Sequence, residues 1–107
     1  MNHSWAFIYD APETDPAVDR FVIDRGGVRN TIVAVPDQAA AAKVAVELVD
    51  GGVQFIELCG GFGPVGAAKV IEAVGGRVAV GVVTFGAESI SKLAAVFAPA
   101  TKTGETA

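Results

Sequence analysis

Apolar residues in this chain are grouped in short runs that glycine, proline and acidic residues separate. Runs of this length, rich in β-branched and aromatic side chains and bounded by turn-forming residues, are typical of β-strands. The pattern predicts strands at residues 5–9, 21–24, 30–35, 53–59 and 78–85. The last run, VAVGVVTF, is apolar throughout, which is the pattern of a strand buried on both faces of a sheet.

Segments rich in alanine and other good helix formers follow the three later strands. Asp37 is placed to accept a hydrogen bond from a first-turn amide and so to cap a helix over 38–49. Pro64 is suited to the first turn of a second helix, which a pair of glycines ends. Residues 88–97 predict a third, amphipathic helix. Its apolar side consists of Ile90, Leu93, Ala94 and Phe97.

The alternation of strand and helix from residue 30 onward predicts an α/β fold. Right-handed βαβ units place three parallel strands side by side, with crossover helices packed on the sheet. The strand at 5–9 adds an N-terminal member whose direction stays open. The strands at 21–24 and 30–35 form a hairpin around the glycine turn at Gly26 and Gly27.

Length, charge and composition limit the classes of function. The 107 residues predict a single domain at 1–98 and a flexible polar tail at 99–107. The net charge is −4 and the eight Lys and Arg residues are scattered, which excludes nucleic acid as the main partner. A hydrophobic content of 51% on so short a chain predicts a homo-oligomer. Without a membrane-length apolar run or a signal peptide pattern, we expect a cytoplasmic protein with no membrane partner.

The chain has one cysteine, Cys59, and one histidine, His3. It therefore predicts no internal disulfide, no Cys/His zinc site and no assigned metal, and the cofactor stays unknown. Cys59 and His3 form a nucleophile and base only if the strand at 5–9 is antiparallel, because a parallel strand places His3 at the opposite end of the sheet. A small buried hydrophobic residue is the favoured interpretation of Cys59.

The segment ELCGGFGP at 57–64 is the main candidate site, because ligands of open parallel sheets bind beyond the carboxyl ends of the strands. Backbone amides of a glycine-rich loop at a helix start favour an anion. The predicted ligand-binding residues are Gly60, Gly61, Phe62, Gly63 and Thr84, with Asp37 also shaping the pocket. The spacing matches neither a Walker loop nor a dinucleotide fingerprint, and a tight turn between strand and helix is the competing explanation.

Glu57 and Cys59 are the candidate catalytic residues. Alternation along a strand places both on one face together with Phe55. A glutamate in a strand predicted to be buried is costly unless its carboxylate is paired, hydrogen-bonded or protonated. A general acid or base is one interpretation of Glu57, and a structural ion pair with Arg77 or with a partner subunit is the other.

Four features carry a resemblance to a known family: WAFIY at 5–9, DP in the acidic loop at 15–16, the long segment around ELCGGFGP at 46–76, and VGVVTFGAESISKLAAVF at 80–97. They resemble a family of small bacterial proteins known as a domain of unknown function, DUF6506, and the resemblance covers residues 5–97. It implies no activity. Members often have a histidine where this chain has Asp19, so this chain departs from the family pattern at that position.

Two classes of function follow from the sequence. The first is the binding of a small anionic metabolite at the strand ends around residues 57–64, with a small enzyme as one form of it. The alternative is a non-enzymatic oligomeric accessory or structural protein, in which glycines serve close packing and apolar surface serves assembly. The fold resembles part of a phosphate-binding β/α barrel only by analogy, which supports no particular substrate.

Overall fold

The structure is a computed structural model that describes residues 2–99 of the chain. The predicted tail at 99–107 lies outside the described residues except for Pro99. The strands are β1 (His3–Asp10), β2 (Arg20–Arg25), β3 (Val28–Val35), β4 (Phe55–Leu58) and β5 (Ala79–Val82). The helices are α1 (Gln38–Asp50), α2 (Gly63–Ala73) and α3 (Ile90–Phe97), with short 3-10 turns η1 (Gly60–Phe62) and η2 (Ala87–Ser89). No helix in this range is long and apolar enough to cross a membrane.

The strands form one sheet in the order β2-β3-β1-β4-β5, which confirms the predicted α/β class. β3, β4 and β5 are parallel, as the βαβ pattern predicts, but they are not all adjacent. β1 is also parallel and lies between β3 and β4, paired with both. β2 is antiparallel to β3 and completes the predicted hairpin, in which Gly26 and Gly27 have positive φ values of 61° and 80°.

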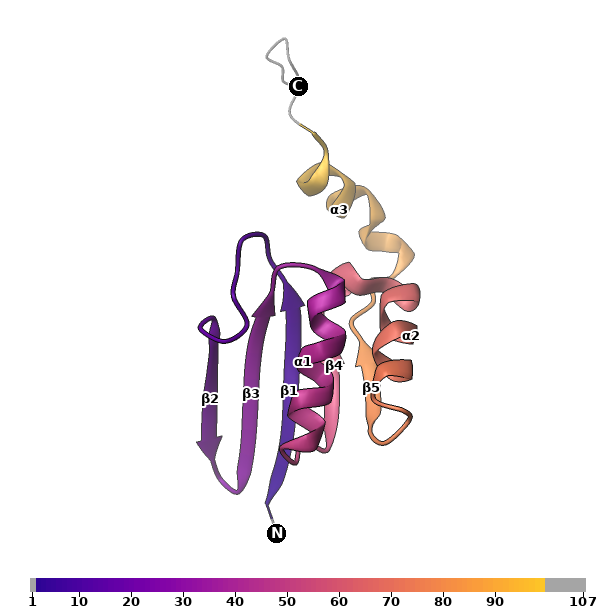
Figure 1. Cartoon of the computed structure of the whole chain (residues 1–107). Helices are drawn as coiled ribbons and strands as arrows, with labels where there is room; N and C mark the ends of the chain where they lie inside the picture. The colour runs from indigo at the N-terminus through magenta and orange to yellow at the C-terminus, as the bar shows by residue number, and fades with distance from the viewer. Residues whose placement is uncertain (1, 100–107) are drawn as a thin grey trace.

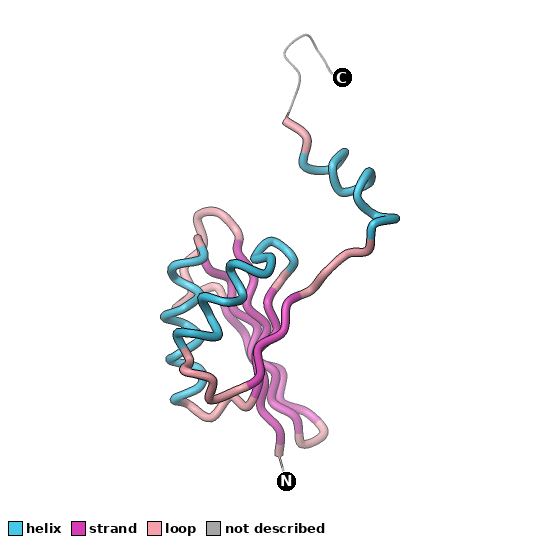
Figure 2. The backbone as a smooth tube through the Cα atoms, turned by 90° about the vertical axis from the view of Figure 1, so that its right-hand side faces the viewer, coloured by secondary structure: helices cyan, strands magenta, loops and turns pink. Residues whose placement is uncertain are grey.

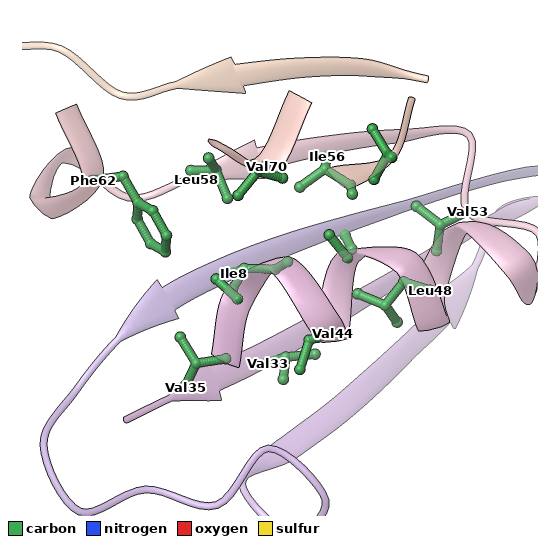
Figure 3. Packing of buried hydrophobic residues seen from close by; sticks show 14 of the residues in the cluster. Ile8, Val33, Val35, Val44, Leu48, Val53, Ile56, Leu58, Phe62 and Val70 are labelled. Atoms are coloured by element: carbon green, nitrogen blue, oxygen red, sulfur yellow. The ribbon is translucent and has the colours of Figure 1, made fainter. Parts of the chain in front are cut away.

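Both long helices, α1 and α2, cover the same face of the sheet (Figures 1 and 2). The core lies between them and the sheet, and Figure 3 shows its side chains. Alternate strand residues supply the sheet side of this core, because successive side chains point to opposite faces. They are Ala6, Ile8, Val33, Val35, Ile56 and Leu58, each at most 1% exposed.

Local signals position the helices as predicted. Asp37 Oδ1 accepts a hydrogen bond from the Ala40 amide at 2.9 Å, which makes Asp37 the N-cap of α1. Pro64 lies in the first turn of α2, where its missing N–H leaves no helical hydrogen bond unmade. Gly63, just before it, has φ 62° and ψ −177°, a backbone conformation that is essentially restricted to glycine.

No helix within residues 2–99 packs on the second face of the sheet (Figure 2), and we call it the open face. Trp5, Phe7 and Tyr9 of β1 lie on it, as do Phe55 and Glu57 of β4. The rings of Trp5 and Phe55 stack at a centroid distance of 5.3 Å, and those of Phe7 and Tyr9 at 6.1 Å. One face of this sheet is therefore a packed core and the other an aromatic surface.

The prediction of a doubly buried strand at 78–85 was wrong. β5 spans only Ala79–Val82, and its residues are exposed or half-buried. It is the edge strand of the sheet and α2 covers only one of its faces, so its apolar residues lack a second layer. The amphipathic helix predicted at 88–97 is present as η2 and α3, but α3 extends away from the body of the domain and has no buried residue (Figure 1).

Candidate functional site

The loop after β4 lies at the carboxyl edge of the sheet, beside the end of β1. The Cys59 amide donates to the Ile8 carbonyl at 3.1 Å, which continues the β1–β4 pairing by one residue. The chain then turns through η1 into α2. The tight strand-to-helix turn expected for this sequence is therefore present, and its position next to β1 decides what surrounds it.

Asp10, the last residue of β1, is the charged group that meets this loop. The Cys59 thiol donates to Asp10 Oδ1 at 3.3 Å. A methyl group on Gly61 would lie 2.9 Å from the same oxygen, closer than side-chain carbons normally approach. Gly61 thus permits Asp10 to lie against the loop. Sequence reasoning missed Asp10, because its proximity to Cys59 depends on β1 lying beside β4.

The other loop residues also serve packing. Phe62 is 4% exposed and belongs to the core, and its amide donates to the Cys59 carbonyl at 3.1 Å. A methyl group on Gly60 would lie 3.2 Å from Phe85 Cε1. Gln38 Nε2 donates to the Gly61 carbonyl at 3.2 Å and ties α1 to the turn. The anion cradle stays a prediction, and the Asp10 carboxylate weighs against it because like charges repel.

Glu57 is not buried, so the prediction of a costly buried carboxylate was wrong. It lies exposed on the open face, since α1 and α2 both pack on the other side of the sheet (Figure 2). The suggested ion pair with Arg77 was wrong as well, because Arg77 Nη1 pairs with Asp50 Oδ1 at 2.8 Å. Within residues 2–99 no hydrogen bond or ion pair engages the Glu57 carboxylate.

Phe7 and Gly81 flank Glu57 on the neighbouring strands. The pairing register places Phe7 opposite Glu57 on β1 and Gly81 opposite it on β5. A hollow of about 240 Å³ lies here, lined by Glu57, Gly81, Val82 and Val83. A methyl group added at Gly81 would meet no atom within 4 Å, so the missing side chain leaves space beside the carboxylate. We call this space the Glu57 hollow.

The two predicted catalytic residues lie in different surroundings. Cys59 follows the last residue of β4, where strand alternation no longer holds, and it packs partly against the core and toward Asp10. Glu57 lies on the open face. Thr84 is exposed in the segment after β5. The structure therefore divides the predicted site between the Glu57 hollow and the strand-end loop.

His3 starts β1, at the opposite end of the sheet from Cys59, because β1 is parallel to β4. A Cys59–His3 nucleophile and base pair is therefore wrong for this chain. A second hollow of about 400 Å³ near His3 is lined by polar residues, including the ion-paired Asp24 and Arg29. In the described part of the chain, no three His, Cys, Asp or Glu side chains are grouped closely enough to hold a metal ion.

A family model described as a family of unknown function, DUF6506, matches residues 3–98. The chain belongs to this family. No curated protein and no solved structure matches the chain.

The DUF6506 match includes every helix and strand of the structure. The matched range runs from the first residue of β1 to the residue after α3. The open face and the projecting helix are thus both parts of the family domain. Asp19, which stands where a histidine was expected from the resemblance, accepts a hydrogen bond from the Asp15 amide at 2.7 Å within the loop between β1 and β2.

Proposed function

We propose that this protein binds a small molecule at the Glu57 hollow. The carrying observation is a carboxylate that is exposed, unpaired within residues 2–99, and located beside a hollow on an otherwise apolar part of a sheet. Its ligand would carry amino or hydroxyl groups that donate to Glu57, together with an apolar part that lies against Val82 and Val83. Pockets of this kind, apolar with a few placed polar groups, are the usual form of small-molecule sites.

Two features of the hollow support binding there. Within residues 2–99 no side chain competes for the Glu57 carboxylate, and a hydrogen bond to a charged group is stronger than one between neutral groups. Gly81 lines the hollow without a side chain, which leaves space for a ligand there. At about 240 Å³ the hollow lies below the range of about 300–1,000 Å³ that drug-sized ligands occupy, so the ligand is small.

Glu57 also has the chemistry of a general acid or base. An enzyme acting on the bound molecule is therefore one form of the same proposal, and Glu57 is its candidate catalytic residue. Cys59, by contrast, donates to Asp10 and lies partly in the core, which favours a structural role. The free thiol suits a reducing compartment, so a cytoplasmic location belongs to the proposal as well.

An anionic ligand at residues 60–63, as the sequence suggested, is the competing proposal. It keeps the support of a glycine-rich turn leading into α2. Against it, Asp10 places a carboxylate next to Gly61, and Phe62 has its amide engaged and its ring buried. A ligand that offers hydrogen-bond donors to Glu57 fits the described side chains better.

A thermal-shift screen with two compound sets tests the proposal. One set contains small amines and polyols, and the other contains phosphorylated and carboxylated metabolites. The variants are Glu57→Gln, which removes the charge, and Gly81→Val, which fills the hollow without a backbone clash. Glu72→Gln, the same chemical change at an exposed position of α2, is the matched control.

We expect a compound of the first set to raise the melting temperature of the wild type and of Glu72→Gln. The same shift should fall by more than half in Glu57→Gln and in Gly81→Val. The proposal fails if no compound of the first set stabilises the wild type, or if the shift is equal in all four proteins. Stabilisation by anions alone that survives Glu57→Gln would favour the strand-end loop instead.

A further inference from the structure

We infer that two copies of this chain form a dimer by exchanging α3, with the helix of each copy packed on the open face of the other. The inference starts from two apolar surfaces that the single chain leaves exposed. On α3, Ile90 is 63% and Phe97 is 79% exposed. On the sheet, Tyr9 and Phe55 are each 36% exposed, although aromatic side chains are normally well covered in a folded domain.

The two surfaces are complementary in kind. A sheet with one helical layer is stabilised by a second layer on its other face, and helices on both faces are the usual arrangement for a largely parallel sheet. The apolar side of α3 repeats at the spacing that a helix presents to a flat partner. Its residues are Ile90, Leu93, Ala94 and Phe97. Ser91 and Lys92 lie on the other side, where water would remain.

The dimensions also agree. An eight-residue helix is about 12 Å long, and with its side chains it is about 10 Å wide. Strands lie about 4.8 Å apart, so one such helix covers two neighbouring strands. The pair β1 and β4 carries the aromatic residues of the open face, which are Trp5, Phe7, Tyr9 and Phe55. The Glu57 hollow lies to one side of this pair, between β4 and β5.

The segment before α3 favours a second copy over the chain's own open face. The Val83 amide donates to the Leu58 carbonyl at 3.0 Å, and Phe85 packs close to Gly60. These contacts hold the chain up to Phe85 against the loop after β4 and direct it beyond the carboxyl edge of the sheet. Gly86 alone separates this held segment from η2. Figures 1 and 2 show α3 past the carboxyl edge of the sheet, on the side opposite α1 and α2 but beyond the strand ends, so it does not lie over the chain's own open face.

The area available is that of a small specific interface. If a whole aromatic side chain buries about 200 Å², Phe97 exposes roughly 160 Å². With Ile90 and the half-buried Leu93, the helix offers on the order of 300 Å² per copy, and an equal area of sheet is covered in each contact. A two-fold pair makes the contact twice, which gives about 1,200 Å², the lower end of the range for specific interfaces. Reciprocal exchange also closes the assembly at two copies.

Light scattering coupled to size exclusion, on the full 107-residue chain at micromolar concentration, is the first test. We expect twice the chain mass of 10.9 kDa for the wild type. The double variant Ile90→Asp with Phe97→Asp should be a monomer with unchanged far-UV circular dichroism, because neither residue belongs to the core. Ser91→Asp, the same substitution on the polar side of α3, should remain a dimer. A wild-type monomer, or a dimer unaffected by the double variant, overturns the inference.

Disulfide trapping distinguishes exchange from folding back. In a Cys59→Ala background, Leu93→Cys is made in one chain and Phe7→Cys in another, and the two are mixed and oxidised. We expect a covalent heterodimer, with Ser91→Cys in place of Leu93→Cys giving little product. A chain carrying both cysteines that forms only an internal disulfide, and no covalent dimer, would overturn the inference. Neither readout needs a ligand, so these results are independent of the Glu57 hollow.

Discussion

Replacing Gly61 by alanine tests the contact between Asp10 and the loop after β4. The added methyl group would lie 2.9 Å from Asp10 Oδ1, so the carboxylate must turn away and give up the hydrogen bond from Cys59. That hydrogen bond contributes about 1 kcal/mol and a strained side-chain rotamer costs about 0.5–1.5 kcal/mol. Gly61 has no positive φ, so alanine can adopt its backbone conformation. Alanine then stabilises the domain by about 0.4–1 kcal/mol, because it lowers the conformational entropy of the unfolded chain. We expect a net loss of about 1 kcal/mol.

The sign should reverse when Asp10 is removed. In an Asp10→Ala background Gly61→Ala meets no carboxylate, and we expect it to stabilise the domain by about 0.5 kcal/mol. Urea unfolding, followed by the fluorescence of the single tryptophan at one protein concentration, measures all four proteins of the cycle. The expected coupling energy is about 1.5 kcal/mol. An equal loss in both backgrounds would refute the reasoning, because the turn itself would then reject a side chain.

Two further predictions concern the local signals that place α1 and α2. Asp37→Ala should cost about 1 kcal/mol in urea unfolding through loss of the N-cap, whereas Asp37→Asn should cost little; equal losses would contradict the capping role. Gly63→Ala should cost about 1–3 kcal/mol, because its φ of 62° and ψ of −177° suit only glycine. Gly81→Ala, which has no positive φ and no close neighbour, is the control and should be neutral or slightly stabilising.

The sequence predicts those parts of the fold that depend on neighbouring residues. The cap at Asp37, the proline in the first turn of α2 and the glycine turn of the hairpin each involve groups within a few residues of one another. Strand alternation likewise identifies Ile56 and Leu58 as one face and Phe55 and Glu57 as the other. These features are present in the structure.

Alternation does not say which faces become covered, and this explains the error at Glu57. Both helices lie on the Ile56 side, so Glu57 is exposed although its strand has the composition of a buried one. The Asp10–Cys59 contact could not be predicted either, because it joins residues 49 apart. It requires β1 to lie beside β4, and no local pattern encodes the order of strands in a sheet.

The central position of β1 has a consequence for how this domain can fold. The crossover from β3 through α1 to β4 leaves a gap of one strand, so without β1 the two strands would be about 9.6 Å apart and share no hydrogen bonds. β1 fills that gap by pairing with β3 on one side and β4 on the other. The Ser4 amide also donates a hydrogen bond to Gln54 Oε1, a residue 50 positions away in the sequence. Such distant contacts slow folding, since loop closure precedes the gain from pairing. Loss of this one strand would therefore divide the sheet rather than trim its edge.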